Sequence, residues 1–334
     1  MMALGSTCRL LLLAWLALLI CALTCPRGAD APPGGRGLLI IVSFPNLAYD
    51  VALLADEEDE IAALVPIGAD PHDYQLTPSD IRLLERADLI VSTAHAPFEA
   101  EMRKLVEEGH VRGVLLELPR LPGLRLLVNP ATGQPNYHMP IYDPVNYERF
   151  VDYLSTVLAH LRPGKADEYA ENARRVKESV RELLEKAPRL GLVAVADLPV
   201  VQYAVSWLDV EIISFVLKEP GVPATPGDLM ELEEALANHE VDLVIVCRPT
   251  VVSASEELNA LAKRYGLPII YVPSPMEPGS ILDKLSIVVD QALKLAKGEP
   301  GGPQRGPLGE AILILLSSIL VASTLMAVEI YARD

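Results

Sequence analysis

The sequence predicts an α/β protein in which two parallel-sheet lobes are joined by a long bridging helix. In both halves of the chain, short apolar runs alternate with helical patterns. Strands separated by helices imply parallel sheets, because parallel neighbours need a crossover connection. Residues 145–187 between the halves are helical throughout, broken only at Pro163-Gly164. An N-terminal signal segment and a C-terminal transmembrane helix complete the predicted fold class.

The first half opens with a run of apolar residues at 38–44 (LLIIVSF), which is typical of a strand covered on both faces. The further strands expected in this half are 61–66, 88–92 and 113–118, with helices at 80–87 and 100–108 between them. In the middle, 167–186 has apolar residues at helical spacing and many charges, so this helix should lie along a surface or bridge the lobes.

The second half repeats the alternation of strands and helices. Its expected strands are 192–195, 210–213, 242–246 and 268–272, and its expected helices are 226–239, 255–265 and 279–297. A ligand of such a protein should bind in the cleft between the halves, at the carboxyl ends of the strands.

The composition excludes two classes of protein. The chain has 334 residues, 51% of them hydrophobic, which excludes a disordered chain. Its 45 acidic residues against 28 basic ones give a net charge of −17, which excludes a nucleic-acid partner because the phosphate backbone would repel it.

The two ends of the chain predict membrane targeting. An apolar run at 10–23 follows Arg9, so 1–31 is expected to be a signal peptide or a retained N-terminal anchor. Residues 311–328 carry no charge, which predicts a transmembrane helix over 309–330. The body is therefore expected on the extracytoplasmic side of the cell membrane, held by a single C-terminal span. The predicted parts of the body are an N-terminal lobe (37–144), a helical bridge (145–188), a C-terminal lobe (189–297) and a Pro/Gly linker (298–308).

Two proline-bounded loops carry the histidines of most interest. His72 lies in a turn set by Gly68 and Pro71, ahead of a helix expected to be capped by Ser79 or Asp80. His138 lies just before the long helical region. A rigidly held imidazole at a strand end suits metal ligation, although a histidine that only caps a turn gives the same pattern. His95 follows a strand as well, whereas His110, His160 and His239 are expected at the surface.

The motifs around these histidines resemble those of the zinc/manganese solute-binding proteins of ABC transporters. The resemblance covers 37–297 and is carried by GADPHDYQLTPSDIRLLERADLIV, NYHMPIYDP, EPGVPATPGDLMELEEALANHEVDLVIV and YVPSPMEPGS. It implies two α/β lobes bridged by one long helix, and a single divalent metal ion, Zn²⁺ or Mn²⁺, held between them. It also implies delivery of that ion to a membrane permease powered by an ATPase, with no enzymatic activity and no organic cofactor.

The resemblance assigns ligands one by one. His72 and His138 match the first two ligands of the family. The third position falls on Leu198, and the fourth falls on Pro273. Carboxylates stand near both positions, so Asp197 and Glu277 are the predicted second-lobe ligands.

Because Leu198 and Pro273 cannot bind a metal ion through their side chains, other functions stay open. Two imidazoles alone fill only half of a tetrahedral zinc site. Arg248, at a strand end, would oppose a cation or suit an anionic ligand or chelate. The chain is then a divergent relative that binds a metal chelate or another small ligand, or a regulatory or interaction module. A metal-dependent hydrolase is a further alternative, but no general base stands out beside the histidines, and the nucleotide-binding and hydrolase motifs are absent. Cys247, the only cysteine of the body, is expected in the core.

Overall fold

The structure, a computed structural model, describes residues 36–66, 73–219, 222–223, 225–249 and 253–298. They form two compact units. Unit 1 contains the described residues up to Leu124, together with Val145–Arg181 and Pro278–Ser280. Unit 2 contains Arg125–Pro144, Glu182–Glu277 and the described residues from Ile281 onward. The predicted lobe boundaries stay a prediction.

Unit 1 is built on a four-stranded sheet with the order β2-β1-β3-β4, in which every neighbouring pair is parallel. Its strands are β1 (Leu39–Val42), β2 (Glu60–Ala63), β3 (Leu89–Ser92) and β4 (Val114–Glu117). β1 and β3 are buried along their whole length, as their uninterrupted apolar runs predict. The predicted ends of all four strands lie within three residues of the observed ends.

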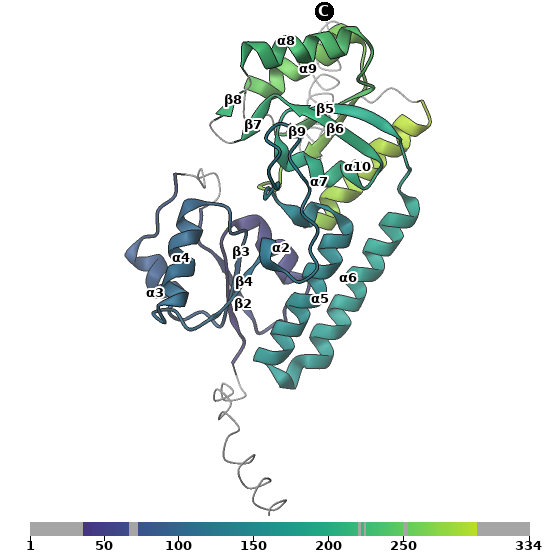
Figure 1. Ribbon diagram of the computed structural model, residues 1–334. Coiled ribbons are helices and arrows are strands. Elements are labelled where there is room, and N and C mark those ends of the chain that lie inside the picture. The colour runs from purple at the N-terminus through teal and green to yellow at the C-terminus, as the bar shows by residue number, and fades with distance from the viewer. Residues whose placement is uncertain (1–35, 67–72, 220–221, 224, 250–252, 299–334) are drawn as a thin grey trace, which may run out of the picture. The chain divides into compact units, whose positions relative to one another are not determined.

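Helices cover both faces of this sheet, with α3 and α4 on one side and α2 and α5 on the other (Figure 1). The helices of this part of the chain are α2 (Pro45–Ala52), α3 (Pro78–Leu84), α4 (Pro97–Glu107), α5 (Pro144–Leu161) and α6 (Ala166–Lys186). Phe98 and Met102 of α4 pack with Leu39, Ile41 and Ile90 in one apolar core. Short 3₁₀ turns lie at Leu118–Arg120 and Pro163–Lys165 in unit 1, and at Pro140–Tyr142 and Pro199–Val201 in unit 2.

Two local expectations have different outcomes. α6 is amphipathic, as predicted, with Tyr169, Val176 and Val180 buried on one face. The expected cap of α3 was wrong: Thr77 caps this helix, and Asp80 completes a capping box with it. Pro78 then occupies the first helical position, where its missing N–H costs nothing.

An ion cluster ties the end of α5 to the loop before β2 within unit 1. Arg162 donates to Asp56 at 2.9 Å and also pairs with Glu58. Lys165 donates to the second oxygen of Asp56 at 2.8 Å. The hydrogen bond from Lys165 holds the pKa of Asp56 well below its usual range. Asp59, whose side chain is fully buried, accepts from the Tyr169 hydroxyl at 2.8 Å.

Unit 2 contains a second four-stranded parallel sheet with the order β10-β9-β5-β6. Its strands are β5 (Leu192–Ala196), β6 (Val210–Phe215), β9 (Leu243–Arg248) and β10 (Ile269–Pro273). Around it lie α7 (Gln202–Ser206), α8 (Pro226–Ala237), α9 (Ser253–Tyr265) and α10 (Ile281–Ala296). Figure 1 shows α8 and α9 on one side of this sheet and α7 and α10 on the other. The predicted α/β class with parallel sheets is confirmed, and the structure shows that each of the two sheets has four strands.

A small antiparallel hairpin, β7 (Leu217–Glu219) with β8 (Val222–Pro223), follows β6 and was not expected from the sequence. It leaves the sheet at the carboxyl end of β6. Because all four strands are parallel, the segments that follow β5, β6, β9 and β10 begin at the same edge of the sheet.

The predicted signal or anchor (1–31) and the predicted transmembrane helix (309–330) lie outside the described residues. Within the ranges given above, no helix combines the length and the apolar character that a membrane span requires.

Candidate metal site

His138 lies in a loop of unit 2 that is fastened to the 3₁₀ turn and helix after β5. The hydroxyl of Tyr203 accepts from the backbone N–H of Leu127 at 2.9 Å and donates to the backbone oxygen of Asn136 at 2.6 Å. The Asn136 N–H in turn donates to the Leu127 carbonyl at 2.7 Å. Tyr203 is fully buried, and this burial raises its pKa to about 12. The phenol is therefore a neutral clamp that holds the loop in place.

Asn136 fixes the imidazole of His138. Its side-chain oxygen lies 2.9 Å from Nδ1 of His138 and accepts from the His138 backbone N–H, also at 2.9 Å. Its side-chain nitrogen donates to the Pro199 carbonyl and to Gln202 Oε1. Met139, the next residue, has a left-handed backbone with φ of 50°, which turns the chain away directly after the histidine.

Glu219, at the end of β7, faces the other ring nitrogen of the same histidine. Its Oε2 lies 3.5 Å from Nε2 of His138. Its Oε1 accepts from Asn129 Nδ2 at 3.0 Å. Asn129 is fully buried and also donates to the Lys218 carbonyl at 2.9 Å. The hairpin and the loop of His138 are thus joined through one buried amide.

Asp197, a predicted ligand, lies at the end of β5 with its side chain fully buried. Its carboxylate accepts from the Cys247 backbone N–H at 2.9 and 3.1 Å and from the Ser255 hydroxyl at 2.5 Å. These bonds tie β5 to β9 and to the first turn of α9. Burial raises the pKa of Asp197 to about 6, despite the hydrogen bonds that favour its ionised form. Its role as a ligand stays a prediction.

This raised pKa predicts a specific pH dependence of stability. A folded carboxyl with a pKa of about 6 binds its proton more tightly than an unfolded one with a pKa of 3.8, so protonation favours the folded state. We expect the free energy of unfolding of the metal-free wild type, relative to Asp197→Asn, to fall by about 2 kcal/mol between pH 4 and pH 7. Urea unfolding at several pH values measures it. A difference that stays constant over this range would show that burial does not perturb this carboxyl.

Glu277 and Pro273 lie on the segment that follows β10. Glu277 is exposed, and its backbone N–H donates to the Ser274 carbonyl at 3.1 Å. The Tyr142 hydroxyl donates to the Pro273 carbonyl at 2.7 Å, so a residue close after His138 contacts the position where the resemblance expects a ligand. Glu277 as a ligand stays a prediction.

Arg248 and Cys247 end β9. The Arg248 guanidinium carbon lies 3.8 Å from the centre of the Tyr271 ring, so one face of this cation stacks on an aromatic ring. Cys247 is buried, and burial raises the pKa of its thiol well above the usual range. The expectation that Cys247 belongs to the core is confirmed.

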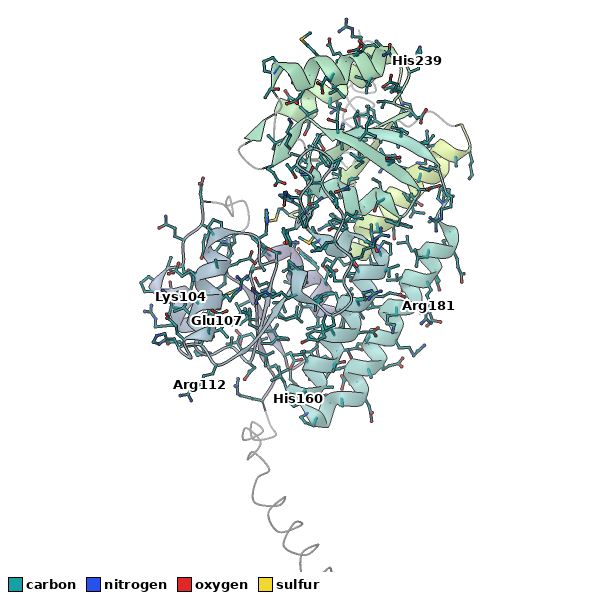
Figure 2. All side chains as sticks on the ribbon, viewed as in Figure 1. Lys104, Glu107, Arg112, His160, Arg181 and His239 are labelled. Carbon is teal, nitrogen blue, oxygen red and sulfur yellow. The ribbon has the colours of Figure 1, made fainter. Side chains whose placement is uncertain are left out.

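The remaining histidines separate clearly. His72 lies outside the described residues. His110, His160 and His239 are exposed, as predicted, and His160 and His239 are labelled in Figure 2. Within the part of the chain that the structure describes, no group of three or more His, Cys, Asp or Glu side chains lies close enough together to hold a metal ion.

Sequence reasoning missed Glu219, Asn129 and Gln202. The first stands in a segment rich in proline and glycine that has no periodicity, so nothing marked it as a strand. Contacts between 129, 138 and 219 depend on tertiary structure, which the spacing of the residues does not show.

The comparisons with known proteins agree with the resemblance. The profile of the family described as "ZnuA: Zinc-uptake complex component A periplasmic" matches residues 40–285. The manganese-binding lipoprotein MntA of Halalkalibacterium halodurans is 28% identical over 151 residues, which are 45% of this chain and 49% of that protein. The high-affinity zinc uptake system protein ZnuA of Haemophilus ducreyi is 32% identical over 90 residues, 27% of this chain and 28% of the relative. The chain thus matches half or less of the length of these relatives.

Solved structures share the fold. The SBP FpvC from Pseudomonas aeruginosa in complex with Mn²⁺ has a TM-score of 0.66 at 18% identity, over 79% of this chain and 99% of the other. The Mn-bound periplasmic metal binding protein from Candidatus Liberibacter asiaticus has a TM-score of 0.58 at 18% identity, over 76% of this chain and 97% of the other.

Proposed function

Because the chain belongs to the family of periplasmic zinc-uptake components, we propose that it is the solute-binding component of an ABC importer for a divalent metal ion, Zn²⁺ or Mn²⁺. The family consists of metal-binding transport proteins rather than enzymes, in keeping with the absence of catalytic motifs from the sequence. The proposed partners are a permease and its ATPase, and the metal ion is the cargo.

The orientation of His138 is the observation that carries the proposal. A histidine that binds a metal through one ring nitrogen usually donates its other N–H to a fixed acceptor, which sets the tautomer and raises the basicity of the ligating nitrogen. Asn136 supplies this acceptor at Nδ1, 2.9 Å away. We propose His138 as one ligand and His72, on its DPHDY motif, as another. Asp197 and Glu277 remain the proposed carboxylates at the positions that the resemblance indicates.

Titration of the metal-free chain tests the function. The full chain is stripped with a chelator in detergent and titrated calorimetrically with Zn²⁺ and separately with Mn²⁺, and elemental analysis follows dialysis. We expect about one ion per chain with a dissociation constant well below micromolar, because several protein ligands converge on one ion. If neither ion binds, the proposal fails, and a retained organic ligand in the same preparation would favour the chelate-binding alternative.

We also propose that 309–330 anchors the protein and that 298–308 is its flexible tether, with the folded body on the extracytoplasmic side. The uncharged run 311–328 supports the anchor, and the Pro/Gly composition of 298–308 supports the tether. We expect the full chain to sediment with membranes and to resist carbonate extraction, whereas a chain ending at Gly298 is released. Release of both chains by carbonate would refute the C-terminal anchor.

A further inference from the structure

Nε2 of His138, the ring nitrogen that faces Glu219, carries a lone pair when the imidazole is neutral. The tautomer follows from a chain of buried amides whose orientations fix one another. Gln202 Nε2 donates to the Val128 carbonyl, so Gln202 Oε1 is an acceptor for Asn136 Nδ2. Asn136 Oδ1 is then an acceptor, and Nδ1 of His138 must carry the proton. Nε2 is left as the ligating atom.

The carboxylate of Glu219 is oriented by the same device. Asn129 Oδ1 accepts from the Ala131 N–H at 2.9 Å, which makes Asn129 Nδ2 the donor to Glu219 Oε1. This bond occupies one carboxylate oxygen and leaves Oε2 directed at His138. The His138 side chain is 12% exposed and that of Glu219 is 32% exposed, so solvent screens this pair only in part.

The separation of the two atoms is longer than a charge-assisted hydrogen bond and matches that of two ligands on one cation. A charge-assisted N–H···O bond would bring them to about 2.7–2.9 Å. The observed distance between Nε2 and Oε2 is 3.5 Å. A metal ion at ordinary Zn–N and Zn–O distances, with a tetrahedral angle between them, holds the two ligand atoms roughly 3.3–3.5 Å apart. A lone pair and a carboxylate oxygen that face each other also repel, and a cation between them removes that repulsion.

We propose that Glu219 is a metal ligand of this chain, paired with Nε2 of His138 on the same divalent ion. This inference rests on the proposed function and gives unit 2 one nitrogen and one carboxylate ligand from residues that the structure already holds in place. It also supplies a negative charge beside His138, although the third ligand position of the family carries Leu198 and the fourth carries Pro273.

The substitution Glu219→Gln tests the proposal with little risk to the fold, because the amide oxygen still accepts from Asn129. We expect the dissociation constant for Zn²⁺ to rise at least about tenfold, since an amide oxygen is a weaker ligand than a carboxylate. Glu211→Gln is the matched control, as Glu211 is exposed on β6 of the same unit, and it should bind like the wild type. The absorption spectrum of the Co²⁺-loaded protein should change in Glu219→Gln and not in the control.

A double-mutant cycle with His138→Gln separates a shared ion from a remote effect. If both residues bind one ion, Glu219→Gln should cost much less in the His138→Gln background than in the wild type. Wild-type or tighter Zn²⁺ binding by Glu219→Gln, or equal costs in both backgrounds, would overturn the inference and leave His138–Glu219 as an ion pair. If only the Glu219 inference fails, the wild type still binds metal and the proposed function stands. A wild type that binds neither Zn²⁺ nor Mn²⁺ overturns both the inference and the proposed function.

Discussion

Replacing His138 with glutamine is expected to weaken Zn²⁺ binding by at least about 100-fold, more than the 10–100-fold that loss of a residue supporting a ligand costs. Glutamine has no nitrogen lone pair to offer in place of Nε2. The backbone N–H of residue 138 still donates to Asn136 Oδ1, so the loop should keep its conformation. Calorimetry of the metal-free variant against the wild type measures the change, and thermal unfolding without metal should be nearly unaltered.

His160→Gln is the control for this experiment. His160 is exposed in the last turn of α5, so the same chemical change there should leave both affinity and stability as in the wild type. Unchanged metal affinity in His138→Gln would show that this histidine is not a ligand. The proposed function would then lose the observation on which it depends.

Replacing Arg162 with methionine is expected to lower the free energy of unfolding by about 3 kcal/mol. This value is near the low end of the cost of breaking a buried ion pair, because Lys165 still pairs with Asp56 in the variant. The side chain of Arg162 is 15% exposed, and those of its partners Asp56 and Asp59 are 2% and 0% exposed. Methionine preserves most of the apolar stem but leaves these carboxylates with less compensation. Urea unfolding at pH 7 measures the loss.

Arg174→Met provides the matched control on α6. Arg174 is 61% exposed and pairs with Glu171 and Glu178, so its loss should leave the free energy of unfolding nearly unchanged. Equal losses in Arg162→Met and Arg174→Met would show that burial of Asp56 and Asp59 adds nothing to the pairing with Arg162.

Much of the fold could be predicted because its strands are covered on both faces. Continuous apolar runs such as Leu39–Val42 and Leu89–Ser92 stand out from amphipathic helices, and parallel pairing follows from the helices between them. α2 was missed because it has only eight residues and begins at Pro45, directly after a strand. The β7–β8 hairpin was missed because its pairing is short and irregular.

The candidate site could be predicted only where a motif is local. His138 is identifiable from NYHMPIYDP, and the same motif contains Asn136, which orients it. Glu219 reaches His138 through a hairpin whose position depends on Asn129, and no local pattern encodes that contact. Asp197 is the carboxylate next to Leu198 in the sequence, but its hydrogen bond with Ser255 depends on tertiary structure and no local pattern shows it.

The support of His138 differs in kind from the ion cluster of unit 1. It consists of carboxamides and one phenol, namely Asn136, Gln202 and Tyr203. Amides do not titrate, and a phenol with a pKa of about 12 stays protonated throughout the physiological range. Neither acidification nor added salt should therefore loosen the frame around the imidazole, because salt screens charges and this frame has none. In the proposed metal site, protons and metal ions would therefore compete only at the ligand atoms, and the pH profile of Zn²⁺ binding would report their protonation rather than a change in the loop.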